Sequence, residues 1–220
     1  MDPLSDIDTK SRILDAAERA FADAGFAAAS LRHIIAAAKV NLAAVHYHFG
    51  SKEGLIEAVF ARRIKPLNEE RLALLDAAEK RAGSRALPVT GVLAAMIGPA
   101  LRLSRDETRG GAAFTRLLGR TLAEPTPGLQ SMLQRQFGDV IARFTAAFRR
   151  ALPRLPEGEL FWRIHFVVGA MAHTMCDPQN LRLMSRDLRD PADAGDLTRR
   201  LVNFLAAGMR APLPKRRTRK

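Results

Sequence analysis

The sequence predicts an all-α protein, and three observations lead to this fold class. Alternating runs of β-branched residues, the usual sign of strands, are absent from the chain. Alanine, leucine and arginine, which favour helices, dominate the composition. Glycine and proline divide the chain into segments of helical length. With 220 residues, of which 47% are hydrophobic, the chain can bury a substantial core in one or two domains.

Three helices are predicted at the amino-terminal end. The first spans about 9–24, carries an apolar stripe along one face and ends at Gly25. Ser30 is a good N-cap for a short second helix. A tight turn at Lys39 follows, and the third helix runs over about 41–50. The apolar stripe of the first helix is expected to brace the two short helices.

A long fourth helix is predicted over 52–81, with Ser51 as its cap. Pro66 lies inside it and should kink or split it, because proline removes an internal hydrogen bond. Residues 177–194 are predicted to form a loop with at most one helical turn. Five further helical segments complete the prediction, at about 88–104, 110–123, 127–151, 157–176 and 195–210.

The segment 157–176 is apolar almost all round, which in a soluble protein indicates a helix that is buried on both sides. The segment 195–210 offers a single apolar stripe that could cover it. The pattern suits either a core within one chain or an interface between two copies, and we prefer homodimerisation. The residues expected at that dimer interface are Phe161, Ile164, Val168, Met171, Leu201, Phe204 and Leu205.

The net charge of +12 suits a polyanionic partner, but its distribution along the chain is uneven. Residues 211–220 form a basic tail that is expected to be disordered and to add only non-specific attraction to phosphate. Residues 24–52 contain Arg32, Lys39 and Lys52 and no aspartate or glutamate. This second stretch is therefore a local positive window.

Several other classes of protein are disfavoured. No apolar run approaches the roughly 18 residues of a membrane span, and the acidic amino terminus does not resemble a secretory signal. A single cysteine, Cys176, allows neither an intramolecular disulfide nor a zinc site built on cysteines, so a cytoplasmic location is expected. No glycine-rich phosphate loop, zinc-type His/Glu spacing or nucleophile elbow indicates an enzyme. We expect no cofactor and no metal.

The positive window carries a distinctive stretch, which reads KVNLAAVHYHFGSKEGL over residues 39–55. Two short helices joined by a tight turn form a helix-turn-helix, whose second helix enters the major groove of DNA. Tyr47 and His48 can hydrogen-bond phosphates, and Lys52 begins the next helix, where free N–H groups already favour an anion. The sequence therefore predicts a DNA-binding unit.

Residues 9–60 resemble the DNA-binding domain of the tetracycline-repressor (TetR) family of transcriptional regulators. The likeness is carried by SRILDAAERAFADAGF, SLRHIIAAAKV and NLAAVHYHFGSKEGLIEAV. The family implies a helical homodimer with a three-helix DNA-reading domain and a larger helical domain that binds a small molecule and dimerises. On this basis we assign the DNA-binding domain to 1–52 and the ligand-binding and dimerisation domain to 53–210.

The resemblance also implies which residues face DNA. Asn41, Leu42 and Ala44 fall where the reading helix of the family meets bases. Tyr47 and His48 fall on phosphate contacts, as does the lysine that begins the fourth helix. The full set expected at DNA is Arg32, Lys39, Asn41, Leu42, Ala44, His46, Tyr47, His48 and Lys52.

Three positions depart from the family pattern. Lys39 stands where glycine is usual, so a positive φ there would cost about 1 kcal/mol. His46 replaces a more frequent tyrosine, and His33 replaces a common acidic partner of the helix cap. Because Leu42 and its alanine neighbours offer only apolar contacts to bases, Asn41 and Arg32, together with DNA shape, should carry much of the discrimination between sequences.

The second domain contains the segments VFARRIKPLNEERLALLDAAE, GAAFTRLLGRTLAEP and LFWRIHFVVGAMAHTM. Through these segments it also resembles the second domain of fatty-acid-responsive repressors. Its composition favours a mostly apolar effector, and the arginines of 102–120 and 135–154 form either a solvated face or the grip on an anionic head group. The alternatives are a DNA-binding activator or architectural protein of the same fold without an effector, and a helical lipid-binding protein. The residues expected to line the ligand pocket are Met96, Leu101, Phe114, Leu117, Phe137, Ile141, Phe144, Phe166 and His173.

Overall fold

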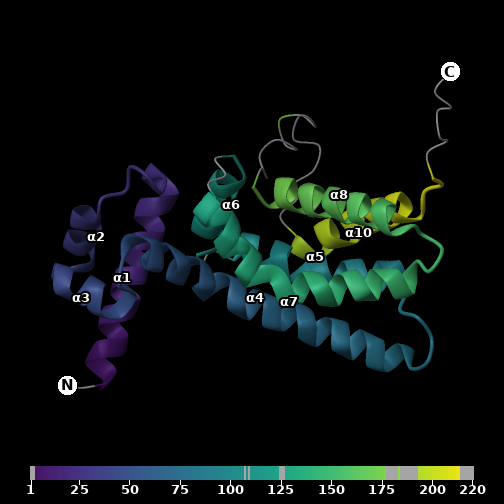
Figure 1. The fold of residues 1–220 in the computed structure, drawn as a ribbon, viewed down its shortest axis with the longest axis horizontal. Coiled ribbons are helices and arrows are strands. Elements are labelled where there is room, and N and C mark those ends of the chain that lie inside the picture. Colours follow the sequence, from purple (N-terminus) through teal and green to yellow (C-terminus); the bar gives the residue numbers. More distant parts are fainter. Residues whose placement is uncertain are drawn as a thin grey trace. The chain divides into compact units, whose positions relative to one another are not determined.

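The computed structural model describes residues 3–106, 108, 110–123, 127–176, 183 and 193–213, and every structural statement below concerns these residues. Their regular structure is helical, and this part of the chain contains no strand. The prediction of an all-α fold is therefore confirmed (Figure 1). The helices are α1 (Pro3–Ala24), α2 (Leu31–Ala38), α3 (Leu42–Phe49), α4 (Lys52–Ala82), α5 (Val89–Arg105), α6 (Gly111–Ala123), α7 (Pro127–Ala151), α8 (Glu157–Cys176) and α10 (Ala194–Arg210).

Most of these bounds lie within a residue or two of the predicted ones. One expectation is wrong: α1 begins at Pro3, several residues before the predicted start. Of the two outcomes expected at Pro66, a kink or a split, the split does not occur, because α4 runs through Pro66. Pro66 is exposed, so water can satisfy the carbonyl that proline leaves without its helical partner. The predicted loop at 177–194, apart from residues 183, 193 and 194, lies outside the described residues, as does most of the basic tail.

The chain folds into two compact units that interleave along the sequence. Unit 1 is formed by Met1–Asn68 and Asp106–Gly138, and unit 2 by Glu69–Arg105 and Asp139–Lys220. The long helices α4 and α7 each contribute to both units. Helix α6 therefore packs with the amino-terminal helices, and no single point in the sequence separates the two units.

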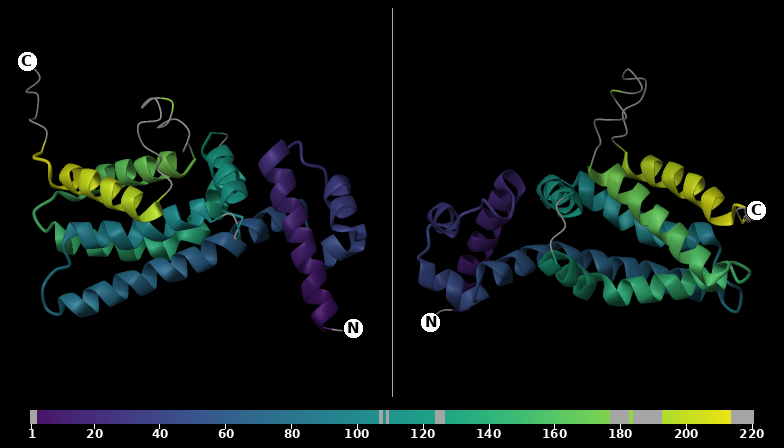
Figure 2. Two further views of the ribbon diagram at one scale, coloured as in Figure 1. Left: turned by 180° about the vertical axis from the view of Figure 1, so that it is seen from behind. Right: turned by 45° about the horizontal axis from the view of Figure 1, so that its top comes forward.

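In unit 1, α2, α3 and α6 all pack on α1. Figure 2 shows α2 and α3 beside α1 from two directions. A row of aromatic rings runs from α1 to α6: Phe21 lies 5.8 Å from Phe26, Phe26 lies 5.9 Å from Phe60, and Phe60 lies 6.4 Å from Phe114. Burial of these rings and of the α1 stripe holds the small unit together.

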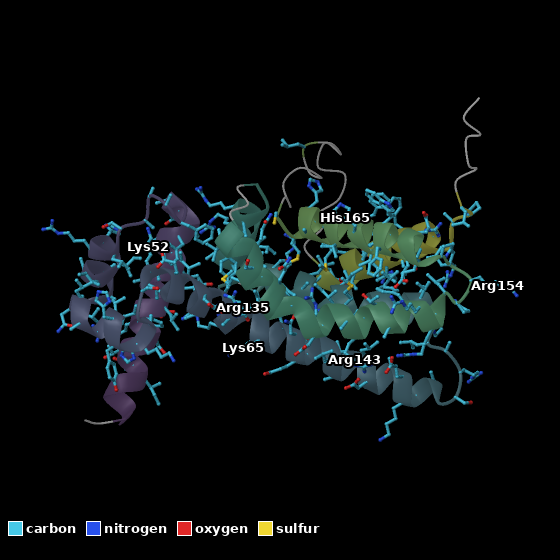
Figure 3. The ribbon with its side chains drawn as sticks, viewed as in Figure 1. Lys52, Lys65, Arg135, Arg143, Arg154 and His165 are labelled. Atoms are coloured by element: carbon cyan, nitrogen blue, oxygen red, sulfur yellow. The ribbon has the colours of Figure 1, made fainter. Side chains whose placement is uncertain are left out.

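In unit 2, α5 packs on α8 and α10, and α8 also contacts α10. Arg143 of α7 reaches α4, where its guanidinium donates to the carboxylates of Asp76 and Glu79 (Figure 3). The hydrogen bond to Asp76, more than that to Glu79, raises the pKa of Arg143. No helix in the described part of the chain has the length and apolar character needed to cross a membrane.

Candidate nucleic-acid interface

Helix α2 is capped at both ends by local contacts. The hydroxyl of Ser30 accepts a hydrogen bond from the backbone N–H of Arg32 at 3.2 Å, which confirms the predicted N-cap. At the other end, Lys39 adopts φ 54° and ψ 48°, the left-handed conformation. The N–H groups of Lys39 and Val40 donate to the carbonyls of Ala36 and Ile35. This is the Schellman ending of a helix, with lysine in the position that glycine usually fills.

Asn41 is the N-cap of α3, and its side-chain oxygen accepts a hydrogen bond from the N–H of Ala44 at 2.9 Å. Val45 is fully buried and anchors the helix. Leu42 and Tyr47 are 46% and 68% exposed, so an apolar and an aromatic side chain stand in solvent on a short helix.

The remaining residues of the predicted set vary in exposure. Arg32, Lys39, Asn41 and His46 are exposed, whereas Ala44, His48 and Lys52 are half-buried. The Nζ of Lys52 donates to the carbonyl of Ala27 at 3.3 Å, and Nδ1 of His46 lies 2.8 Å from the carbonyl of Gly50. Nδ1 is therefore engaged at the end of α3, and Nε2 is the ring nitrogen left to face a phosphate.

The turn from α3 to α4 depends on two glycines. Gly50 ends α3 with φ 73°. Gly54, in the first turn of α4, donates its N–H to the hydroxyl of Ser51 at 3.0 Å. A Cβ at Gly54 would lie 2.1 Å from the carbonyl oxygen of Phe49, which is far inside van der Waals contact. The close approach of α4 to the end of the reading helix therefore requires glycine at this position.

Arg12 is a functional residue that the sequence argument missed. Its Nη2 donates to the carbonyls of Ala38 at 2.6 Å and of Lys39 at 2.8 Å. These are carbonyls at the C-terminus of α2, where cations are favoured by the helix dipole. Arg12 thus fixes the turn of the helix-turn-helix to α1, through a contact 26 residues away that no local pattern reveals.

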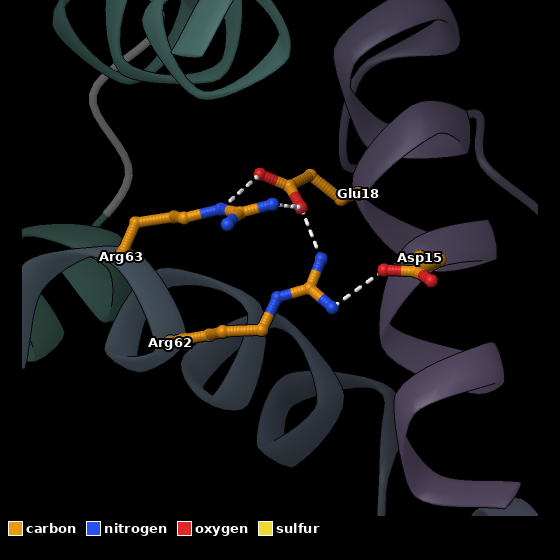
Figure 4. Close-up of polar contacts among 4 residues, drawn as sticks. All are labelled: Asp15, Glu18, Arg62 and Arg63. Atoms are coloured by element: carbon orange, nitrogen blue, oxygen red, sulfur yellow. Dashed lines mark hydrogen bonds and ion pairs between the residues drawn. The ribbon is translucent and has the colours of Figure 1, made fainter. Parts of the chain in front are cut away.

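A buried carboxylate ties α1 to α4 within unit 1 (Figure 4). Glu18 is 3% exposed and accepts from Nε and Nη2 of Arg63 at 3.0 and 2.8 Å, and also from Arg62. Arg62 donates in addition to Asp15 at 2.6 Å. One carboxylate thus holds two guanidinium groups. Loss of either side of such a pair leaves a charge without its partner, which makes the contact sensitive to substitution.

Helix α6 contacts the C-terminus of α1 through Arg120. Arg120 donates from Nε to the carbonyl of Ala22 at 3.1 Å and from Nη2 to that of Asp23 at 2.9 Å. It therefore caps the C-terminus of α1. The same guanidinium lies 3.3 Å from the position that a Cβ on Gly25 would occupy.

The arginines of 102–120 and 135–154 are largely engaged within the chain. Arg102 pairs with Glu70 at 2.6 Å, and Arg135 pairs with Glu57 at 3.2 Å. Arg149 and Arg150 pair with Glu157 and Glu79. The side chains of these four arginines are 51–60% exposed, so their ion pairs lie on a solvated surface, as the first of the two predictions for them has it.

The residues predicted to line a ligand pocket do not share one environment. Met96 and Phe137 are half-buried, whereas Ile141, Phe166 and His173 are exposed. In a single chain the three exposed residues lie on the outer surface and enclose nothing. The remaining predicted pocket residues, all buried, are Leu101, Phe114, Leu117 and Phe144.

The residues predicted at a dimer interface also divide into two groups. Met171 and Leu205 are buried within their own unit, because they face the packed helices α5, α8 and α10. Ile164 and Leu201 are half-buried. Exposed apolar side chains on α8 and α10 are Phe161, Trp162, Phe166, Val168 and Phe204. Trp162, which is not among the residues predicted at the interface, is also exposed, and its spacing from Phe166 places both on one face of α8.

Comparisons with known proteins agree with this arrangement. The chain is 36% identical, over 76 residues, to the nicotine-responsive transcriptional repressor HdnoR of Paenarthrobacter nicotinovorans; the match spans 34% of this chain and 39% of that protein. The chain therefore covers well under half of the length of this relative.

Two solved structures share the fold along nearly the whole chain. SmeT, the repressor of a multidrug efflux pump of Stenotrophomonas maltophilia, is 25% identical, with a TM-score of 0.59 and coverage of 94% of this chain and 100% of that one. The fatty acid degradation regulator FadR of Bacillus halodurans is 14% identical, with a TM-score of 0.67 and coverage of 96% and 99%.

Two family profiles match the sequence itself. Residues 13–59 match the profile described as bacterial regulatory proteins of the tetR family. Residues 94–208, just over half of the chain, match the tetracyclin repressor-like C-terminal domain. Together with the helix-turn-helix of α2 and α3, these matches show that the chain belongs to the TetR family of transcriptional regulators.

Proposed function

We propose that this protein is a cytoplasmic transcriptional repressor that binds a near-palindromic DNA operator as a homodimer and leaves it when a small, mostly apolar effector binds. Residues 1–52 read the operator, and residues 53–210 bind the effector and dimerise. A catalytic role forms no part of the proposal. Family membership supports DNA binding, and the repressors among its relatives support the direction of regulation.

The observation that carries the proposal is the outer surface of α3. An eight-residue helix exposes Leu42, His46 and Tyr47, and the chain around it, residues 24–52, has no carboxylate. A core or protein-binding surface has no need to exclude acids over such a length. A surface that meets phosphates does, because each carboxylate would repel the duplex.

The contacts at DNA are proposed as follows. Arg32 and Asn41 reach bases, while Tyr47, His48 and Lys52 contact phosphates on either side. The oxygen of the Asn41 amide already caps α3, so its NH₂ group is the part available to a base acceptor. Lys52 would exchange its carbonyl partner, Ala27, for a phosphate.

Selection of binding sites from random DNA by the purified protein tests this proposal. We expect a near-palindromic consensus with half-sites about one helical turn, roughly 34 Å, apart. Arg32→Ala and Asn41→Ala should blur the consensus at particular bases. Tyr47→Phe should weaken all sites alike, because it removes a phosphate contact and keeps the ring. Failure to recover any consensus, or binding that is insensitive to salt, would refute DNA reading by α3.

The proposed dimer interface is the exposed apolar face of α8 and α10. Phe204 is 74% exposed, and Trp162 and Phe166 are exposed beside one another on α8 with ring centroids 5.9 Å apart. Sedimentation of Phe204→Glu tests the assignment, with Ile141→Glu, an exposed apolar position on α7, as the matched control. Only the α10 variant should become monomeric. A monomeric wild-type protein, or equal dissociation of both variants, would contradict it.

Release from DNA requires coupling between the effector and the spacing of the two reading helices. A coupling free energy of about 1–3 kcal/mol would suffice. We place it along α4, which begins at Lys52 beside α3 and continues into unit 2, with Pro66 near the division of the units as the pivot. If Pro66→Ala leaves effector-induced release unchanged, the pivot is dispensable.

A further inference from the structure

A pocket in unit 2, which we call the α4–α7 pocket, lies between the C-terminal end of α4, the turn that follows it and α7. It has a volume of about 510 Å³, within the roughly 300–1,000 Å³ typical of small-molecule sites. Among the described residues, its lining holds three arginines but a single carboxylate. The described residues that line it are Glu79, Gly83, Ser84, Arg85, Ala86, Leu87, Arg143 and Arg150.

Two of these arginines are brought together by their spacing on α7. Arg143 and Arg150 are separated by about two helical turns, so they lie on one side of the helix. Both donate from Nη2 to the carboxylate of Glu79 on α4, Arg143 at 3.3 Å. Arg143 also donates from Nη2 to Asp76. The two acids of α4 therefore hold both guanidinium groups at the pocket.

The third arginine comes from the turn after α4. Gly83 follows the helix with φ 63°, a left-handed conformation that glycine adopts without strain. Its N–H donates to the carbonyl of Glu79 at 3.1 Å, and the N–H of Arg85 donates to that of Ala82 at 3.2 Å. This turn brings Arg85 into the lining. The side chain of Arg85 is exposed and makes no hydrogen bond or ion pair within the part of the chain that the structure describes.

The two paired arginines also keep donors available to a ligand. A guanidinium carries five N–H donors, and with the described residues Arg143 and Arg150 form hydrogen bonds through Nη2 only. Their side chains are 41% and 51% exposed. Ion pairs at such exposure contribute little to stability, so these guanidinium groups can be shared with a ligand at small cost.

The balance of charge at the pocket favours an anion. In the described part of the chain, three arginines face two carboxylates here, even when Asp76 is counted. A carboxylate matches the fork of one guanidinium, whereas a phosphoryl group presents several charged oxygens around one centre. A phosphoryl group can therefore accept from guanidinium groups that approach from both α7 and the turn after α4.

We propose that the α4–α7 pocket binds the phosphoryl group of a small molecule through Arg85, Arg143 and Arg150. The half-buried Leu87 of the lining contacts the organic part of this ligand. The pocket is a second site, beyond the proposed function and independent of it. It lies outside residues 1–52, which are proposed to read DNA, and its ligand is charged, unlike the mostly apolar effector.

Phenyl phosphate and phenyl sulfate are suitable probes, because both carry a tetrahedral anion on the same ring and only the phosphate takes a second charge near neutral pH. Isothermal titration of the full-length protein at fixed ionic strength should give tighter binding of the phosphate. Arg85→Met should weaken that binding by about fivefold, since it removes a charged donor. Glu79→Gln should tighten it by about two- to fivefold, because it removes the carboxylate that competes for Arg143 and Arg150.

Arg154→Met is the matched control, because it removes an exposed arginine of unit 2 that lies just beyond α7 and outside the pocket lining (Figure 3). It should leave phenyl phosphate binding unchanged. The cations around α3 are the same in all these variants, so their attraction for phosphate cancels in the comparison.

Equal weakening by Arg85→Met and Arg154→Met would show attraction to net charge alone and would overturn the inference. Equal affinity of the wild-type protein for the two probes, or weaker phosphate binding by Glu79→Gln, would overturn it as well. Arg85→Met should leave the affinity for DNA unchanged. A loss of DNA affinity in this variant would assign the pocket to the phosphates of a duplex and not to a small molecule.

Discussion

Replacing Lys39 by glycine should stabilise the protein while weakening its hold on DNA. Lys39 has φ 54° after α2, a conformation that costs a residue with a Cβ about 1–2 kcal/mol. Glycine removes this strain but adds about 0.4–1 kcal/mol of backbone entropy to the unfolded chain. The difference predicts a net gain of up to about 1.6 kcal/mol, and each kcal/mol corresponds to roughly 2–4 °C in the melting temperature of a chain of this size.

Lys39→Ala isolates the two effects. Alanine removes the same exposed charge but keeps the Cβ, so its stability should stay within about 0.5 kcal/mol of the wild-type protein. On DNA both variants should behave alike: each removes one cation per subunit, and the slope of log K against log salt should become shallower by about 0.9 for each phosphate that the protein no longer neutralises. Urea unfolding and salt-dependent titration measure the two quantities. If Lys39→Gly is less stable than Lys39→Ala, the argument from backbone strain fails.

Three further substitutions test contacts around the reading helix. Arg12→Ala should lower the free energy of unfolding in urea by about 1 kcal/mol, because it removes a charge-assisted hydrogen bond that is partly exposed to solvent. The control is Arg19→Ala, at an exposed arginine of the same helix, which should leave the free energy of unfolding nearly unchanged. Asn41→Ala should lose about 1 kcal/mol of N-cap stability, and Asn41→Ser should restore stability without restoring base selectivity in a site selection. Gly54→Ala should cost about 1–3 kcal/mol through its clash with Phe49, whereas Gly138→Ala, in open space on α7, should gain about 0.5–1 kcal/mol; two changes of the same sign would contradict the close approach.

The helices could be predicted from the sequence because their signals are local. Ser30 and Asn41 mark the starts of α2 and α3 through contacts only two or three residues long. The left-handed conformation of Lys39 is implied by the family resemblance, because glycine is usual at this position, and the structure has it in a Schellman ending. Each of these features is determined by residues within one turn, which a single sequence displays.

The contacts that brace the reading unit could not be predicted, because they join distant parts of the chain. Arg120 meets the end of α1 across almost a hundred residues, and nothing in the sequence of α6 indicates it. The sequence does indicate the buried position of Glu18. It lies four residues after Leu14 and three before Phe21, so a charge interrupts the buried stripe of α1. A charged residue at such a position calls for a partner, which α4 supplies twice.

These contacts change what the net charge of +12 means. Arg12 and Arg120 cap the C-termini of α2 and α1, and Arg163 caps that of α10. Arg62 and Arg63 share the Glu18 carboxylate. These five arginines therefore satisfy helix ends and a buried acid within the chain and are not available to phosphate. The proposal that this protein binds DNA depends instead on the absence of carboxylates from residues 24–52, around α3. The total charge of the chain does not show this local feature.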